Sequence, residues 1–247
     1  MTFIGIIPAR YQSSRFPGKP LAILGGKTVI ERVYTQAHKA LEKVVVATDD
    51  ERIVACVESF GGEVVMTSLN HRSGTDRVWE AYQKIAPNSE DQDIIINIQG
   101  DEPFISPEQI IAVKSCFPCQ IATLAMPMTQ EKEILNPNNV KVVFSETNRQ
   151  ALYFSRHPIP FVRNVENSQS PVYYKHIGLY AYRADILKQI ASMPPSRLER
   201  LESLEQLRWL ENGLSIRCAL TNTATIGIDT PEDLLQAEQW LAQHNLA

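Results

Sequence analysis

The first half of the chain alternates continuous apolar segments with segments in which apolar residues recur every three or four positions. The continuous apolar segments are typical of strands that are buried on both faces of a sheet. They comprise residues 3–8, 43–48, 63–67 and 93–98. The helical spacing begins at Val29, Ile53 and Val78. Together these patterns predict strands that are separated by single helices. A further helix is predicted after Ser106, which caps it together with Gln109 in a capping box, with Pro107 at the first helical position.

The pattern changes after about residue 128. Three segments, residues 140–144, 151–156 and 176–182, have the composition of strands that are joined by polar turns, without helices between them. Helical spacing resumes at Asp185, and it predicts one continuous helix over residues 199–212.

The end of the chain returns to the earlier alternation. Residues 215–220 are predicted to form a strand, and a last helix is predicted after Thr230, which serves as its cap, with Pro231 in the first turn. Strands of this apolar kind, alternating with helices, imply an α/β fold with a doubly wound, mostly parallel sheet. We expect a single domain over residues 1–247, with a smaller antiparallel lobe inserted at about 130–184.

Composition and charge exclude several classes of protein. The formal net charge of −4, without a basic stripe, argues against nucleic-acid binding. The longest early apolar run is residues 3–8, which is too short for a secretion signal or a membrane span, so we expect a cytoplasmic protein. The CxxC pair of Cys116 and Cys119 has no second ligand pair nearby, and we expect it to be structural.

Cations are concentrated at the start of the chain. The first thirty residues contain Arg10, Arg15, Lys19 and Lys27 and no Asp or Glu. The first three of these follow directly after the first predicted strand, which is where an open α/β sheet binds its ligand. Two planar guanidinium groups and an ammonium group suit a polyphosphate, although the loop lacks the GxxxxGK[ST] pattern of a Walker loop. A small anionic ligand is favoured over a solvated surface loop. Lys27 is expected to be a turn residue.

Carboxylates end two other apolar segments. Asp101 follows the strand at 93–98 within NIQGDEP, and this position suits a Mg²⁺ ligand. Asp229 ends the run IGID just before the last helix. Two interpretations of Asp229 stay open at this point, because it either precedes a capped helix or completes a carboxylate pair with Asp101. Spacing along the chain does not decide between them.

The motifs resemble, in order and over essentially the whole chain, those of the 3-deoxy-manno-octulosonate (Kdo) cytidylyltransferases, also called CMP-Kdo synthetases. The matching segments are PARYQSSRFPGKPL at 8–21, VVATDDERI at 45–53, HRSGTDR at 71–77, NIQGDEP at 97–103, NPNNVKVVF at 136–144, ALYFSR at 151–156, YKHIGLYAYR at 174–183, LESLEQLRWLENG at 201–213 and GIDTPEDL at 227–234. The first motif together with QGDEP and KHIG is highly specific.

The resemblance implies a nucleotidyltransferase, Rossmann-like fold and a homodimer, with the inserted lobe serving dimerisation and sugar binding. It implies that CTP and Kdo, with Mg²⁺ as cofactor, give CMP-Kdo and pyrophosphate for lipopolysaccharide synthesis. The nucleotide ligands it implies are Pro8, Ala9, Arg10, Arg15, Lys19, Ser73, Gly74 and Asp101. The implied catalytic residues are Lys19, Arg10 and Asp101, and the implied metal ligands are Asp101 and Asp229. The implied sugar-acid ligands are Gln99, Arg156, His176, Tyr180, Glu205 and Gln206.

Simpler roles compete for several of these residues. Ser73 has the position of a helix N-cap, which is compatible with a contact to the base. His176 lies in an alternating strand and suits a structural role as well as a ligand role. Glu205 and Gln206 lie within a predicted helix, where solvated polar side chains are common. The rival functions are a cytidylyltransferase for a related sugar acid, such as 8-amino-Kdo or sialic acid, a sugar-1-phosphate nucleotidyltransferase, and a catalytically silent nucleotide-binding protein.

Overall fold

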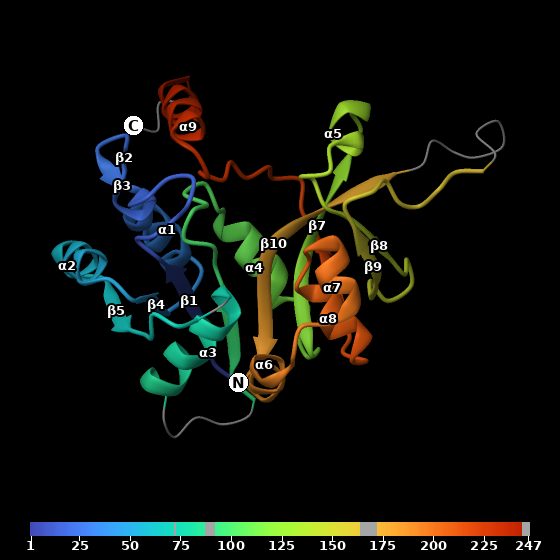
Figure 1. Ribbon diagram of the computed structural model, residues 1–247, viewed down its shortest axis with the longest axis horizontal. Coiled ribbons are helices and arrows are strands. Elements are labelled where there is room, and N and C mark those ends of the chain that lie inside the picture. The colour runs from blue at the N-terminus through green and yellow to red at the C-terminus, as the bar shows by residue number, and fades with distance from the viewer. Residues whose placement is uncertain (72, 87–91, 164–171, 244–247) are drawn as a thin grey trace. The chain divides into compact units, whose positions relative to one another are not determined.

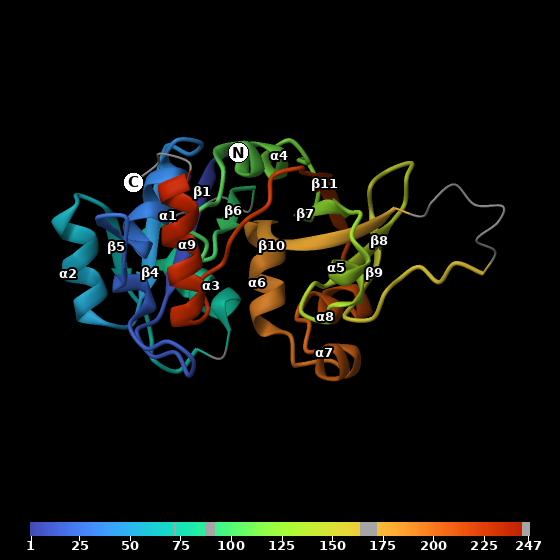
Figure 2. The same ribbon diagram turned by 90° about the horizontal axis from the view of Figure 1, so that it is seen from above.

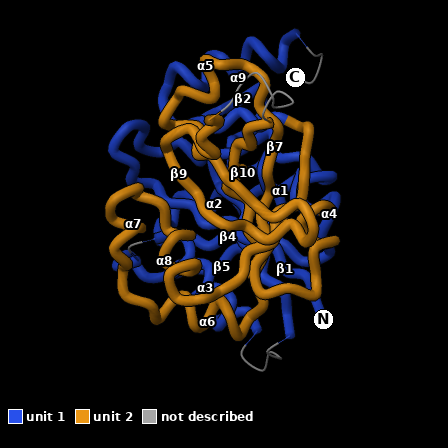
Figure 3. Tube along the Cα trace, turned by 90° about the vertical axis from the view of Figure 1, so that its right-hand side faces the viewer, with its two compact units in different colours: residues 1–110, 224–247 blue, residues 111–223 orange. Residues whose placement is uncertain are grey.

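The computed structural model describes residues 1–71, 73–86, 92–163 and 172–243 (Figure 1). The chain forms two compact units, which Figure 3 colours separately. Unit 1 combines Met1–Ile110 with Ala224–Ala247, and unit 2 is Ile111–Thr223. The segment expected to form an inserted lobe, at about 130–184, lies within unit 2, which extends beyond it in both directions.

Unit 1 is built on four parallel strands. They are β1 (Phe3–Ala9), β4 (Lys43–Thr48), β5 (Glu63–Met66) and β6 (Ile94–Asn97), in the spatial order β6-β1-β4-β5. All three pairings are parallel, with Ile6 of β1 opposite Val45 of β4 and Asn97 of β6. Isoleucine and valine side chains along β1, β4 and β6 are buried, which is why these segments are apolar throughout, whereas the valines of β5 are partly exposed. The predicted α/β class with a mostly parallel sheet is confirmed.

Single helices separate these strands, two further helices follow later in the chain, and side chains cap several of them as expected. The helices are α1 (Val29–His38), α2 (Glu51–Ser59), α3 (Gly74–Ile85), α4 (Pro107–Lys114) and α9 (Pro231–Gln243). The Ser73 hydroxyl accepts a hydrogen bond from the Asp76 amide at 3.1 Å. Ser106 and Gln109 cap reciprocally, each side chain accepting from the other's amide. These side chains satisfy amide groups that a helix leaves without partners at its start.

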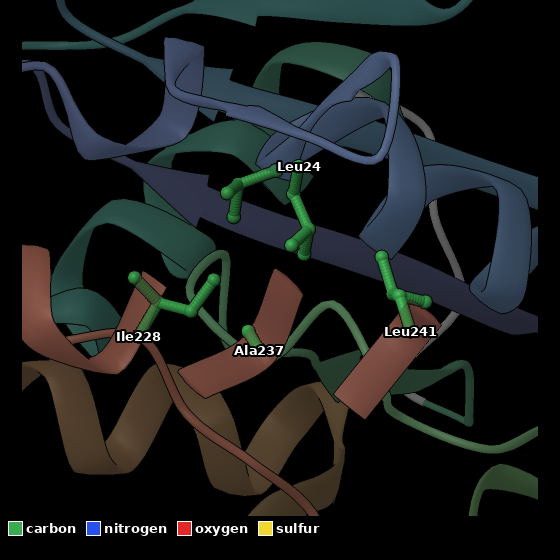
Figure 4. Close-up of a cluster of buried hydrophobic side chains, with 5 residues drawn as sticks. Leu24, Ile228, Ala237 and Leu241 are labelled. Atoms are coloured by element: carbon green, nitrogen blue, oxygen red, sulfur yellow. The ribbon is translucent and has the colours of Figure 1, made fainter. Parts of the chain in front are cut away.

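A cluster of buried side chains joins the beginning and the end of the chain within unit 1. Leu24 of strand β2 (Ile23–Leu24), Val29 of α1, Ile228, and Ala237 and Leu241 of α9 form this cluster, which we call the terminal cluster (Figure 4). All five are between 0% and 2% exposed. β2 pairs with β3 (Lys27–Thr28) in a short hairpin. The turn lies at Gly25 and Gly26, so Lys27, which was expected to be a turn residue, begins the second strand instead. As a result α9 packs beside α1 (Figure 2).

Unit 2 is mainly antiparallel. Its strands are β7 (Ile121–Met128), β8 (Lys141–Phe144), β9 (Ala151–Ser155), β10 (Tyr173–Arg183) and β11 (Ile216–Leu220). β10 pairs antiparallel with β7 and β8, and β8 pairs antiparallel with β9, while β11 runs parallel to β7. Helices α5 (Glu131–Leu135) and α6 (Ala184–Ser192) follow β7 and β10. The antiparallel pairing expected for this part of the chain is confirmed, whereas α5 was not predicted.

The prediction of one helix over residues 199–212 is wrong. The segment forms two short helices, α7 (Arg197–Glu202) and α8 (Gln206–Glu211). Ser203 between them has a φ of 51°, in the left-handed region that ends helices. The Arg156 side chain donates to the carbonyl groups of Glu202 and Ser203 at 2.7 and 3.3 Å. These tertiary bonds take up carbonyl groups at the break, while the apolar spacing runs through it unchanged.

Candidate active site

A cavity of about 990 Å³ opens in unit 1 beyond the carboxyl ends of β1, β4 and β6. Its lining contains every residue expected to bind the nucleotide and the metal, together with Gln99. The residues concerned are Pro8, Ala9, Arg10, Arg15, Lys19, Ser73, Gly74, Gln99, Asp101 and Asp229. The strand ends of a parallel sheet meet at one edge, so segments that are distant in sequence reach a common space there.

The cationic first loop is closed on itself at Gly18. The Gly18 amide donates to the Tyr11 carbonyl at 2.7 Å, and Gly18 has a φ of 75°. The positive φ favours glycine, and a Cβ atom at this position would lie tightly against the Tyr11 ring, at 3.1 Å. The guanidinium carbon of Arg52 lies 3.3 Å from the centre of the same ring. The turn places Lys19, the next residue, at the start of a single helical turn over Lys19–Leu21.

Lys19 forms ion pairs with both acidic residues of the proposed metal site. Its Nζ lies 2.6 Å from Oδ2 of Asp101 and 3.1 Å from Oδ1 of Asp229. Arg15 reaches the other oxygen of Asp229 at 3.1 Å. The Lys19 side chain is 13% exposed, compared with 63% for Arg15. Two of the three early cations and the two distant carboxylates therefore converge, and the exposed Arg10 lines the same cavity.

Backbone contacts explain why the two carboxylates meet. The Ile228 amide donates to the Asp101 carbonyl at 2.8 Å, which fixes the segment before Asp229 against the loop that follows β6. The Ile228 side chain is anchored in the terminal cluster, and Phe104 packs against that cluster. The Asp233 carboxylate accepts hydrogen bonds from the amides of Asp229 and Thr230. Asp229 thus precedes a capped helix, and its carboxylate also shares Lys19 with that of Asp101. The two interpretations of Asp229 given by the sequence are therefore compatible.

Gly100 permits close packing of two segments at the edge of the cavity. A Cβ atom at Gly100 would lie 2.7 Å from the Pro8 carbonyl oxygen, closer than a real Cβ contact. The loop NIQGDEP therefore passes directly against the end of β1. Any residue other than glycine at position 100 would place its Cβ atom against the backbone of Pro8. This approach sets the position of the neighbouring Asp101 relative to the first loop.

Sequence reasoning left Arg77 and Asp49 without a role, although both line the cavity. Arg77 of α3 is 1% exposed, and its guanidinium donates to the Thr67 hydroxyl at 2.6 Å and to Asp49 at 2.5 Å. These bonds join α3 to the ends of β4 and β5, and so hold Ser73 and Gly74 at the rim. The signal in the sequence is an arginine beside Val78, on the apolar face of a helix, because buried arginines are almost always paired.

The carboxylate pair fits a magnesium ion. The ammonium group of Lys19 is within hydrogen-bond distance of both side chains, so oxygens of Asp101 and Asp229 already converge on a single cation. Magnesium is commonly held by one or two carboxylates, with substrate phosphates and water completing its shell. In the described part of the chain, no group of three or more His, Cys, Asp or Glu side chains is arranged to hold a metal ion. A site with two carboxylates would need further ligands, such as phosphate oxygens and water, to complete the shell.

Five of the six expected sugar-acid ligands lie in unit 2. Arg156 follows β9, and its guanidinium donates to the carbonyl groups of Pro137, Glu202 and Ser203. Its backbone amide donates to the Glu202 carboxylate at 2.9 Å. Arg156 therefore connects β9 to the end of α7, and its role in sugar binding stays a prediction.

His176 and Tyr180 are neighbours on β10, with ring centres 5.3 Å apart. Burial lowers the pKa of His176 to about 3, so its imidazole is neutral at neutral pH. The Thr123 hydroxyl lies 3.1 Å from Nε2 of His176 and within donating distance of two carbonyl groups, so we infer that Nε2 carries the proton. With Nε2–H bonded to Thr123, His176 has Nδ1 as a hydrogen-bond acceptor and carries no positive charge. Burial also raises the pKa of Tyr180, which stays protonated.

Glu205 and Gln206 lie at the start of α8, directly after the break at Ser203. The Glu205 carboxylate accepts a hydrogen bond from Arg208 at 2.8 Å, and Gln206 is 5% exposed. Their position at a helix start, rather than within one long helix, follows from the break described above. Their role in sugar binding stays a prediction.

The CxxC pair lies at the entry to β7 in unit 2. Cys116 is buried, and both cysteines carry free thiols. Burial raises the pKa of Cys119 to about 12, so the thiol is protonated and weakly nucleophilic at neutral pH. A structural role is consistent with this environment.

Comparison with known proteins identifies the family. The family described as Cytidylyltransferase matches residues 4–216. The chain is 57% identical to the 3-deoxy-manno-octulosonate cytidylyltransferases of Phocaeicola vulgatus and Bacteroides thetaiotaomicron, and each match covers 98% of both proteins. A solved structure described as CMP:2-keto-3-deoxy-manno-octonic acid synthetase complexed with CTP superposes with a TM-score of 0.91 at 42% identity. That match covers 99% of this chain and 100% of the other. The chain therefore belongs to the 3-deoxy-manno-octulosonate cytidylyltransferases, a family of nucleotidyltransferases.

Proposed function

We propose that this protein transfers CMP from CTP to the anomeric hydroxyl of Kdo, giving CMP-Kdo and pyrophosphate. The observation that carries the proposal is the convergence of Arg15, Lys19, Asp101 and Asp229 on one cavity at the strand ends of unit 1. The near full-length similarity to curated Kdo cytidylyltransferases supports Kdo as the acceptor. The intact QGDEP motif is consistent with this choice.

In this reaction the anomeric oxygen bonds to the α-phosphorus while the bond from that phosphorus to the bridging oxygen of pyrophosphate breaks. The hydroxyl proton is released to solvent or base, and the leaving oxygen keeps the electron pair. Arg10, Arg15 and Lys19 neutralise the triphosphate and align it, since phosphoryl transfer needs charge stabilisation more than covalent help. The rim formed by Pro8, Ala9, Ser73 and Gly74 would receive the cytidine.

Asp101 and Asp229 would hold Mg²⁺ together with the phosphates. When bound, the ion supplies Lewis-acid stabilisation of phosphate charge and lowers the pKa of the attacking hydroxyl. Asp101 and Asp229 would supply the protein's ligands to the ion, and both already contact Lys19 of the first loop. Gln99 lines the same cavity and would contact the acceptor sugar.

The experiment that tests this function is direct detection of the product. The protein is incubated with CTP, MgCl₂ and Kdo, and the mixture is sampled quickly for mass spectrometry, since such products hydrolyse. We expect CMP-Kdo and an equal amount of pyrophosphate. Matched reactions replace Kdo by 8-amino-Kdo, sialic acid or a sugar-1-phosphate, and CTP by the other triphosphates. Faster turnover of any of these would overturn the assignment, and CTP binding without turnover would point to a silent homologue.

We further propose that the protein acts as a homodimer through unit 2, in the cytoplasm, to supply lipopolysaccharide synthesis. Several large apolar side chains of unit 2 are exposed, with Phe161 at 89%, Leu201 at 69% and Leu152 at 63%. Contact with a second copy of the chain would remove such side chains from water, which is favourable. In the described part of the chain, no helix is long and apolar enough to cross a membrane.

The dimer is tested by sedimentation. We expect the wild-type protein to sediment at twice the mass of the chain and the Phe161→Asp variant to shift toward the monomer. Leu235→Asp, at an exposed apolar position of α9 in unit 1, is the matched control and should remain dimeric. A monomeric wild-type protein would refute this part of the proposal.

A further inference from the structure

Lys19 occupies the position between the two carboxylates that the proposed function assigns to the metal ion. Its ammonium group is 2.6 Å from Asp101 and 3.1 Å from Asp229. We propose that Lys19 is a resident counter-cation that holds the metal site closed until the nucleotide arrives. This inference rests on the proposed function, because it concerns the same site and the order in which the site is filled.

The ion pairs are a built feature rather than a chance surface contact. Lys19 is only 13% exposed, and the Gly18 turn and the helical turn over Lys19–Leu21 fix its backbone. The carboxylates are brought together independently of Lys19, through the bond between Ile228 and Asp101 and the capping of Asp229 by Asp233. Two carboxylates held in this way repel each other unless a cation lies between them.

The same ammonium group is also suited to the triphosphate. Once phosphate oxygens draw Lys19 and the neighbouring Arg15 away from the carboxylates, Asp101 and Asp229 face each other without those cations. A divalent ion then gains two carboxylate ligands as well as the phosphates. Lysine and metal compete for the same oxygens, so nucleotide binding must raise the affinity for metal. By reciprocity, metal must raise the affinity for nucleotide by the same factor.

A lysine that serves only as a phosphate ligand makes the opposite prediction. In that case, removing Lys19 weakens CTP binding but leaves the metal affinity of the nucleotide-free protein unchanged. If Lys19 is the resident counter-cation, its removal opens the carboxylate pair and strengthens metal binding in the absence of nucleotide. The two roles are therefore separated by a binding measurement that does not depend on catalysis.

The experiment measures Mn²⁺ binding to the full-length protein, using the electron paramagnetic resonance signal of free Mn²⁺, with and without CTP. Without nucleotide, we expect Lys19→Met to bind Mn²⁺ at least about five-fold more tightly than wild type, as expected for losing a charged hydrogen bond. Lys27→Met removes the same charge from a pair with Glu31 elsewhere in unit 1 and should bind Mn²⁺ like wild type. The increase in affinity on adding CTP should be smaller in Lys19→Met than in wild type.

Equal Mn²⁺ affinity of wild type and Lys19→Met without CTP would overturn the inference. So would an equal gain for Lys27→Met, because net charge alone would then explain the effect. Lys19→Gln, which keeps a polar side chain, repeats the comparison, and circular dichroism checks the fold of each variant. The Asp101→Asn variant distinguishes a failure of the inference about Lys19 from a failure of the proposed function. If that variant binds Mn²⁺ in the presence of CTP as wild type does, the metal assignment itself is wrong.

Discussion

Replacing Lys19 by alanine should lower kcat by about ten-fold to a hundred-fold. One charged hydrogen bond contributes about 1.5–3 kcal/mol, and Lys19 is expected to make such a bond to the phosphate charge that develops during transfer. Little change in thermal stability is expected, because Asp101 and Asp229 are 31% and 48% exposed and water can solvate them when the lysine is lost. Steady-state release of pyrophosphate measures kcat.

Lys27→Ala is the control for this experiment. Lys27 is a cation of the same early segment, but it pairs with Glu31 at 2.8 Å and does not line the cavity of about 990 Å³. It should retain wild-type turnover. Lys19→Ala turning over at the wild-type rate would mean that another cation, such as Arg10, carries the phosphate charge.

Replacing Asp101 by asparagine should have the largest effect, a loss of at least about a thousand-fold in kcat. Metal assistance in phosphoryl transfer supplies several kcal/mol, and a neutral amide is a weak ligand for magnesium. The remaining activity should no longer rise with MgCl₂ over the range that saturates the wild type. Titration of turnover against MgCl₂, at saturating CTP and Kdo, measures both effects.

Glu31→Gln removes the same charge from unit 1 outside the cavity and provides the matched control, with a wild-type magnesium titration expected. An Asp101→Asn titration that overlays that of wild type would exclude Asp101 as a metal ligand. Circular dichroism of the variant is needed because Lys19 loses one of its two carboxylate partners.

Most of the fold of unit 1 could be predicted because buried parallel strands leave a direct trace in the sequence. The strand predicted at 43–48 has the observed bounds, and that predicted at 93–98 is one residue longer at each end than β6. The capping residues Ser73, Ser106 and Thr230 could also be recognised, since capping is a local interaction.

The parts that were missed depend on contacts between distant residues. The break at Ser203 follows from bonds to Arg156, and no glycine or proline marks it. Arg77 was passed over because a charged residue on a helix is usually solvated, and its buried partner Asp49 lies 28 residues away. That Asp101 and Asp229 form a carboxylate pair was a hypothesis, because each ends an apolar segment. The bond between Ile228 and Asp101 supplies the physical reason why they meet.

The expected sugar-acid ligands were the hardest residues to predict from the sequence. The cations that follow strand β1 indicate a phosphate site, because their charge can be recognised in the sequence. Residues that bind sugar hydroxyl groups have no comparable sequence pattern. His176 is instructive, because burial makes its ring neutral, a property that depends on packing rather than on residue type. The assignments of Arg156, Glu205 and Gln206 come from the family resemblance alone.

The path of the chain also bears on how the protein is made. Lys19 and Asp229 are 210 residues apart in sequence, and unit 1 is interrupted by the whole of unit 2. Forming such a long-range pair carries a large loop-closure cost, which favours late assembly. On the ribosome, β1, β4, β5 and β6 emerge well before α9 and Ile228 can close the terminal cluster over them. The nascent chain therefore leaves the side chains of Leu24 and Val29 without their partners from α9 until synthesis is nearly finished. Asp229, the second carboxylate of the site, also becomes available only at that stage.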